Sequence, residues 1–171
     1  MGHHPRPDVR SQPFDVSKRL SPGAESAVSS ELGYRATTGV QLARITVVNT
    51  HPEFLEMVRD ILESDRYEAI TIDADEPGAL DRIRESAPDL LMIDLRLGQD
   101  GSNGWDLARE LTSESGFAGL PILVCSGDIA ALNDIEPTIS DDPRIETLAK
   151  PFGVDELTDA IDRLLAESVD R

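Results

Sequence analysis

The sequence predicts a doubly wound parallel α/β domain, and three observations lead to this fold class. The 171 residues match the usual length of a single domain. From residue 44 onward, five short apolar runs alternate with stretches of helical apolar periodicity. Hydrophobic residues make up 39% of the chain and aromatic residues only 4%, which indicates the aliphatic core that parallel sheets bury.

The five apolar runs are predicted strands because each has four or five residues and is rich in Ile, Val and Leu. They occupy residues 45–48, 69–72, 90–93, 122–125 and 145–149. The first, third and fourth are almost wholly apolar, as in strands covered on both faces. The second contains Thr71, and the fifth contains Glu146 and Thr147, as edge strands do. The predicted strand order is therefore 2-1-3-4-5, with right-handed crossovers and helices on both faces.

Between and after the strands, apolar residues recur every three or four positions, which predicts amphipathic helices. The positions are Phe54, Val58, Ile61 and Leu62; Leu80 and Ile83; Trp105, Ala108 and Leu111; and Val154, Leu157, Ile161, Leu164 and Leu165. Residues 129–139 give a weaker helical signal because Pro137 interrupts them.

Residues 1–43 are predicted to be a disordered tail, because Pro, Gly, Ser and Thr are frequent there without a sustained apolar period. Residues 44–171 form the predicted domain, with 11 basic and 29 acidic residues. This negative charge disfavours nucleic acid or an anionic membrane as a direct partner, which leaves proteins as the expected partners.

The chain is expected to be cytoplasmic. Cys125 has no second cysteine to pair with and lies in an apolar run, so we expect a small buried hydrophobe rather than a reactive thiol. No stretch approaches the roughly 18 apolar residues of a membrane span, and residues 1–9 lack the apolar core of a signal peptide.

Polar residues stand at the carboxyl ends of the predicted strands, where sheets of this order bind ligands. Asp94 ends the third strand, Ser126 and Gly127 follow the fourth, and Lys150, the only lysine after residue 43, follows the fifth. A carboxylate, a hydroxyl and an ammonium group around one crevice suit capture of a phosphoryl group. Asp94 would attack phosphorus, Ser126 would donate to a phosphoryl oxygen, Lys150 would neutralise charge, and Gly127 would leave room.

Plainer interpretations of these residues stay open. Asp94 is also explained as a polar strand end, Lys150 as a surface lysine and Ser126 as a helix cap. Asn49 and Thr50 follow the first strand and are either turn or capping residues or a residual metal or phosphate contact.

Five segments together resemble the receiver domain of bacterial response regulators: VVNTHPEF, LLMIDLRLG, NGWDLA, PILVCSG and LAKPF, within residues 44–168. The resemblance implies a flavodoxin-like fold in which Asp94 accepts phosphate and Ser126 and Lys150 are the family's hydroxyl and lysine. It also implies a histidine kinase or phosphotransfer protein as donor. A downstream protein effector would then read the surface around the fourth helix and fifth strand.

The chain departs from this family at its acidic pair. Receivers carry two acids after the first strand to hold Mg²⁺, whereas this chain has Asn49 and Thr50. Asp94 remains as a carboxylate ligand, beside the backbone carbonyl of Arg96 and the amide oxygen of Asn49. We therefore expect weakened Mg²⁺ binding and slow or absent phosphorylation.

Two further departures concern the switch and a loop. The aromatic switch position, three residues before the lysine, holds Thr147, so rotation of an aromatic ring is not the expected readout. The loop over residues 95–104 is longer than the family norm, and its glycines at 98, 101 and 104 predict mobility.

The leading hypothesis is a stand-alone response regulator receiver in phosphorelay signalling that accepts a phosphoryl group on Asp94 and acts through protein contacts, not as an enzyme. It is expected to lack an output domain, since only 21 residues follow Lys150. The alternative is a phosphorylation-independent pseudo-receiver, a protein-binding module, which Asn49, Thr50 and Thr147 favour. A phosphohydrolase or flavin carrier lacks support, because Arg96 stands where a second acid is needed and no glycine-rich loop follows the first strand.

Overall fold

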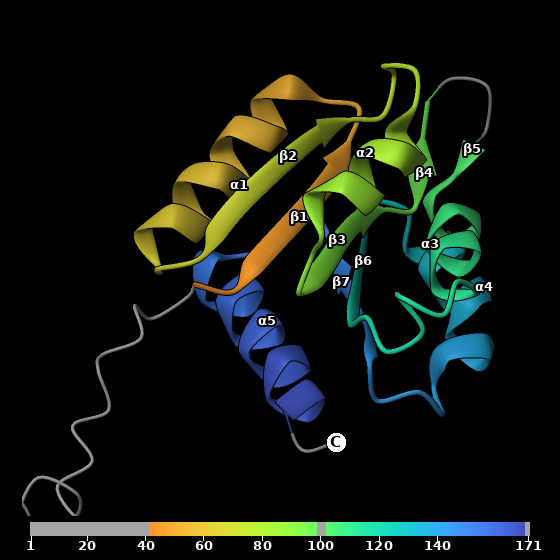
Figure 1. Ribbon diagram of the computed structural model, residues 1–171. Helices are drawn as coiled ribbons and strands as arrows, with labels where there is room; N and C mark the ends of the chain where they lie inside the picture. The colour runs from red at the N-terminus through yellow and green to blue at the C-terminus, as the bar shows by residue number, and fades with distance from the viewer. Residues whose placement is uncertain (1–41, 99–101, 170–171) are drawn as a thin grey trace, which may run out of the picture. The chain divides into compact units, whose positions relative to one another are not determined.

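The structure is a computed structural model that describes residues 42–98 and 102–169 (Figure 1). The strands are β1 (Arg44–Asn49), β2 (Glu68–Asp73), β3 (Leu90–Asp94), β4 (Arg96–Leu97), β5 (Ser102–Asn103), β6 (Ile122–Ser126) and β7 (Ile145–Ala149). The helices are α1 (Pro52–Ser64), α2 (Ala79–Ser86), α3 (Gly104–Thr112), α4 (Ile129–Ile139) and α5 (Val154–Val169). A disordered tail was predicted for residues 1–43. Residues 1–41 of it lie outside the described residues, so the tail stays a prediction.

Five strands form one parallel sheet in the order β2-β1-β3-β6-β7. These strands are the five predicted runs, so the predicted fold class and the order 2-1-3-4-5 are confirmed. The edge strands β2 and β7 are mostly half-buried, whereas β3 and β6 are buried almost throughout. The polar residues of the second and fifth runs thus marked the two edges.

Two hydrophobic cores lie on the two faces of the sheet, because side chains alternate between the faces along each strand. In β3, Leu90 and Met92 pack with α1 and α5, whereas Leu91 and Ile93 pack with α2, α3 and α4. Figure 1 shows α1 and α5 together on one side of the sheet. This arrangement leaves the carboxyl ends of the central strands uncovered at one edge.

Helix α4 corrects one expectation, since Pro137 does not interrupt it. The proline lies in the last turn, where it removes only the hydrogen bond that residue 137 would give to the carbonyl of Asn133. At the other end, Asp128 caps the helix by accepting a hydrogen bond from the backbone N–H of Ala131 at 3.1 Å. The start of α4 is therefore well defined.

The loop after β3 contains an unpredicted two-stranded antiparallel ladder, β4 with β5. Gly98 adopts a positive φ of 76°, which glycine tolerates best. Gly104 packs against the backbone of β3, and a Cβ there would lie 2.0 Å from the carbonyl oxygen of Asp94. Gly101 lies outside the described residues. Gly98 therefore has a conformational reason for its position, and Gly104 has a steric one.

Gly104→Ala is expected to destabilise the domain by at least about 2 kcal/mol, because the new Cβ would also lie 2.9 Å from Cγ1 of Ile93. Urea unfolding followed by Trp105 fluorescence measures the loss. Gly116→Ala is the matched control, since a Cβ there meets nothing within 4 Å, and we expect a change within about 0.5 kcal/mol. Equal stability of the two variants would contradict the packing described.

Candidate functional site

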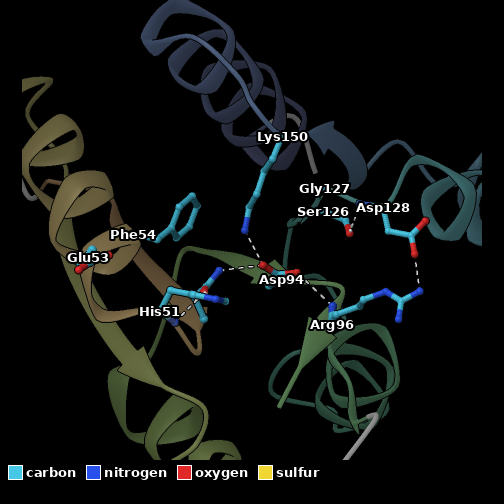
Figure 2. Close-up of a pocket in the computed structure, with 10 residues that line it drawn as sticks. His51, Glu53, Phe54, Asp94, Arg96, Ser126, Gly127, Asp128 and Lys150 are labelled. Atoms are coloured by element: carbon cyan, nitrogen blue, oxygen red, sulfur yellow. Dashed lines mark hydrogen bonds and ion pairs between the residues drawn. The ribbon is translucent and has the colours of Figure 1, made fainter. Parts of the chain in front are cut away.

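A pocket of about 490 Å³ lies at the carboxyl ends of the strands, where the winding reverses between β1 and β3 (Figure 2). Its lining residues are Asn49, His51, Glu53, Phe54, Asp94, Arg96, Ser126, Gly127, Asp128 and Lys150. The predicted residues Asp94, Ser126, Gly127 and Lys150 are therefore brought together, although up to 56 positions separate them.

Asp94 and Lys150 form an ion pair across the pocket, in which the lysine Nζ contacts Oδ2 of the carboxylate. Their side chains are 12% and 21% exposed. The lysine is fixed from behind, because its backbone N–H donates to the carbonyl of Ser126 at 2.8 Å. The expectation that these two charges face each other is confirmed.

Two further donors hold the Asp94 carboxylate. The side-chain amide of Asn49 donates to Oδ2 at 2.9 Å, and the backbone N–H of Arg96 donates to Oδ1 at 3.0 Å. Asn49 is buried, and its amide oxygen accepts a hydrogen bond from the backbone N–H of His51 at 3.0 Å. Both ends of the Asn49 amide are therefore engaged by the protein itself.

This donor set does not fit a magnesium site. Mg²⁺ takes oxygen ligands, usually with one or two carboxylates, but the Asn49 group that faces Asp94 is an N–H donor. Between residues 42 and 169, the gap at 99–101 apart, no group of three or more His, Cys, Asp and Glu side chains is placed to hold a metal ion. The Asn49 amide oxygen was suggested as a Mg²⁺ ligand, but in the structure it already accepts a hydrogen bond from the backbone N–H of His51.

Ser126 is buried at the end of β6, and its Oγ accepts a hydrogen bond from the backbone N–H of Asp128 at 3.1 Å. The side chain that caps α4 is Asp128, not Ser126. The serine hydroxyl hydrogen therefore stays available to a ligand in the pocket. At Gly127 a Cβ would meet nothing within 4 Å, so the backbone there borders open space.

Sequence reasoning missed an aromatic side chain that contacts the lysine. The Nζ of Lys150 lies 3.9 Å from the centre of the Phe54 ring, a favourable cation–π distance. Phe152 packs edge-on against the same ring, with 6.1 Å between ring centres. Phe54 was expected on the core face of its helix. Only the long-range contact reveals its second role, and helical periodicity carries no signal for it.

Two predicted residues do not line the pocket. Thr50 is half-buried, and its hydroxyl lies 3.3 Å from the His51 ring nitrogen Nδ1. Thr147 is half-buried in the middle of β7, where it pairs with Val124. Thr50, at the second position of the family's acidic pair, therefore does not line the pocket, and neither does Thr147 at the switch position.

Cys125 is fully buried below the site, as expected. Burial raises the pKa of its thiol to about 12, with a further rise from Asp94 and an opposing effect of Lys150. In the described ranges 42–98 and 102–169, no helix is long and apolar enough to cross a membrane.

Comparisons with known proteins agree with the fold. Residues 45–162 match the family model of the response regulator receiver domain. The chain is 37% identical over 81 residues to the DNA-binding response regulator MtrA of Mycolicibacterium smegmatis, a match that covers 47% of this chain and 33% of MtrA. The chain thus spans about a third of the length of the curated relatives it matches.

Solved structures give the same fold. The chemotaxis response regulator CheY4 of Vibrio cholerae superposes with a TM-score of 0.60 at 20% identity, covering 72% of this chain and 98% of CheY4. NtrX from Brucella abortus, solved in complex with ATP, has a TM-score of 0.59 at 30% identity and covers 74% of this chain and 28% of NtrX.

The raised pKa predicts that Cys125 stays unreactive in the folded protein. At pH 8 a thiol with a pKa of about 12 is ionised in roughly one molecule in ten thousand, and burial also blocks access. A chromogenic disulfide reagent should therefore label the protein only after unfolding in urea, with Cys125→Ala as the blank. Labelling of the folded protein at the rate of the unfolded chain would contradict this placement.

Proposed function

The chain belongs to the response regulator receiver family of two-component signalling, and on this premise we propose that it accepts a phosphoryl group on Asp94. The observation that carries the proposal is the Asp94 carboxylate at an open pocket, paired with the Lys150 ammonium group. Lys150 and Asn49 hold Oδ2, whereas within residues 42–98 and 102–169 Oδ1 accepts one hydrogen bond, from the backbone of Arg96. Oδ1 is therefore the proposed nucleophilic atom.

The transfer exchanges one bond at phosphorus for another. Oδ1 of Asp94 forms a bond to phosphorus while the bond from phosphorus to the donor's imidazole nitrogen breaks. The electron pair of the broken bond stays on that nitrogen, which ends protonated from solvent. The product is an acyl phosphate on Asp94.

The surrounding residues supply charge and space for this transfer. Lys150 neutralises negative charge as it develops on the phosphoryl oxygens, and Phe54 holds the ammonium group in position. The Ser126 hydroxyl donates to a phosphoryl oxygen, and Gly127 leaves the room that the group needs.

The proposed donor is a phosphohistidine on a histidine kinase or phosphotransfer protein, and the proposed output is contact with a downstream protein. The name of the MtrA relatives includes DNA binding, but this chain matches only a third of those proteins. The excess of 29 acidic over 11 basic residues in 44–171 opposes direct contact with nucleic acid. A cytoplasmic location stays a prediction.

A second candidate function is a pseudo-receiver that binds partners without being phosphorylated. It is favoured by Asn49, whose amide already donates to the Asp94 carboxylate where the family carries an acid. In that case Asp94 and Lys150 serve stability, and Asp94→Asn leaves partner affinity unchanged.

Incubation of the full chain with phosphoramidate, followed by intact mass measurement, separates the two functions. We expect one added phosphoryl group on the wild type and none on Asp94→Asn, because the amide is not a nucleophile. Asp106→Asn is the matched control, since Asp106 is an exposed aspartate of α3 and its removal should leave the adduct intact. If no adduct forms with either MgCl₂ or EDTA present, the pseudo-receiver is the better description.

A further inference from the structure

An exposed arginine connects the two sides of the pocket. Arg96 is bound through its backbone N–H to Asp94, while its guanidinium group pairs with the carboxylate of Asp128 (Figure 2). The Arg96 side chain is 71% exposed, so little packing holds it in this position. A surface ion pair of this kind contributes little to stability. Stability of the fold therefore does not account for the arginine at the edge of the pocket.

The charge at the site calls for a second cation. A phosphoryl group carries a charge of about −2 at neutral pH. Lys150 supplies one positive charge, and the residues around Asp94 do not fit a divalent ion. His51 is a weaker candidate, since its ring lies 3.1 Å from the Asn49 amide oxygen. Arg96 carries a permanent charge on a planar fork of donors that matches phosphate oxygens.

We propose that Arg96 binds the phosphoryl group of phosphorylated Asp94 in place of a divalent cation, an inference that rests on the proposed function. To reach the phosphoryl group, Arg96 would break its ion pair with Asp128. The backbone nitrogen of Arg96 lies 3.0 Å from Oδ1 of Asp94, so the arginine side chain starts beside the atom that receives phosphorus. Asp128 carries one negative charge against the larger charge of the phosphoryl group, which favours the exchange.

The exchange would reach α4 through Asp128. In the unphosphorylated protein the Asp128 carboxylate accepts from Ala131 and Arg96, and its backbone N–H donates to Ser126. Its backbone carbonyl accepts from Leu132 in the first turn of the helix. The Ala131 amide and, next, Arg96 lower the pKa of the Asp128 carboxyl group. Phosphorylation would thus remove the contact between Arg96 and the Asp128 carboxylate.

This route does not need an aromatic residue at the switch position, which here is Thr147. The affected element, α4, also exposes Ile129 at its first position. A change at the amino end of α4 therefore alters an apolar surface that a protein partner is able to read.

The experiment uses the full chain labelled with ¹⁵N and phosphorylated by phosphoramidate. We expect the Arg96 Nε–H signal and the Asp128 and Ala131 amide signals to shift in the wild type. In Arg96→Ala we expect the amide shifts to be lost and phosphorylation to slow by at least about tenfold, as for loss of a charged contact to a transferring group. Arg109→Ala is the matched control, because Arg109 is an exposed arginine that faces Asp106 on α3.

Three results would overturn the proposal. An adduct on the wild type without a shift of the Arg96 signal removes the arginine from the phosphoryl group while leaving phosphoacceptance intact. A phosphorylation rate of Arg96→Ala within twofold of that of Arg109→Ala would also show that the arginine does not contact the phosphoryl group. Failure of the wild type to form any adduct overturns the proposed function itself, and the arginine exchange with it.

Discussion

The ion pair between Asp94 and Lys150 is the interaction on which the rest of the site depends. A parallel sheet aligns the carboxyl ends of its strands, and this alignment places a residue after β7 opposite the last residue of β3. Both side chains are mostly buried, and each charged group has the other as its partner, which offsets the cost of removing the charges from water. Phe54 stabilises the ammonium group from the side, and the carbonyl of Ser126 fixes the lysine backbone.

Much of the fold and part of the site follow from sequence alone. Strand order came from the composition of five runs, and Asp94 and Lys150 came from their positions at strand ends, because both depend on backbone geometry that the sequence pattern specifies. Contacts that depend on side-chain direction were missed, such as Phe54 against Lys150 and Arg96 against Asp128. The β4–β5 ladder was also missed, since two-residue strands leave no periodic signal.

Asn49 determines how this receiver differs from its relatives. Where the family carries an acid, this chain has an amide that donates a hydrogen bond to the Asp94 carboxylate. Sequence reasoning expected weaker magnesium binding from the lost charge. The geometry adds a second reason, since the amide oxygen already binds His51. Under the proposed function, the positive charge that phosphate requires comes from Lys150 and Arg96, and the partner of Arg96 is the residue that caps α4.

Metal dependence of phosphoryl transfer is the most direct measure of this charge balance. The initial rate of transfer from phosphoramidate to the wild-type chain is compared in excess MgCl₂ and in excess EDTA. We expect the two rates to agree within about twofold, because side-chain cations neutralise the phosphoryl group. A reaction that proceeds in MgCl₂ and stops in EDTA would contradict this balance and assign the charge to a divalent ion instead.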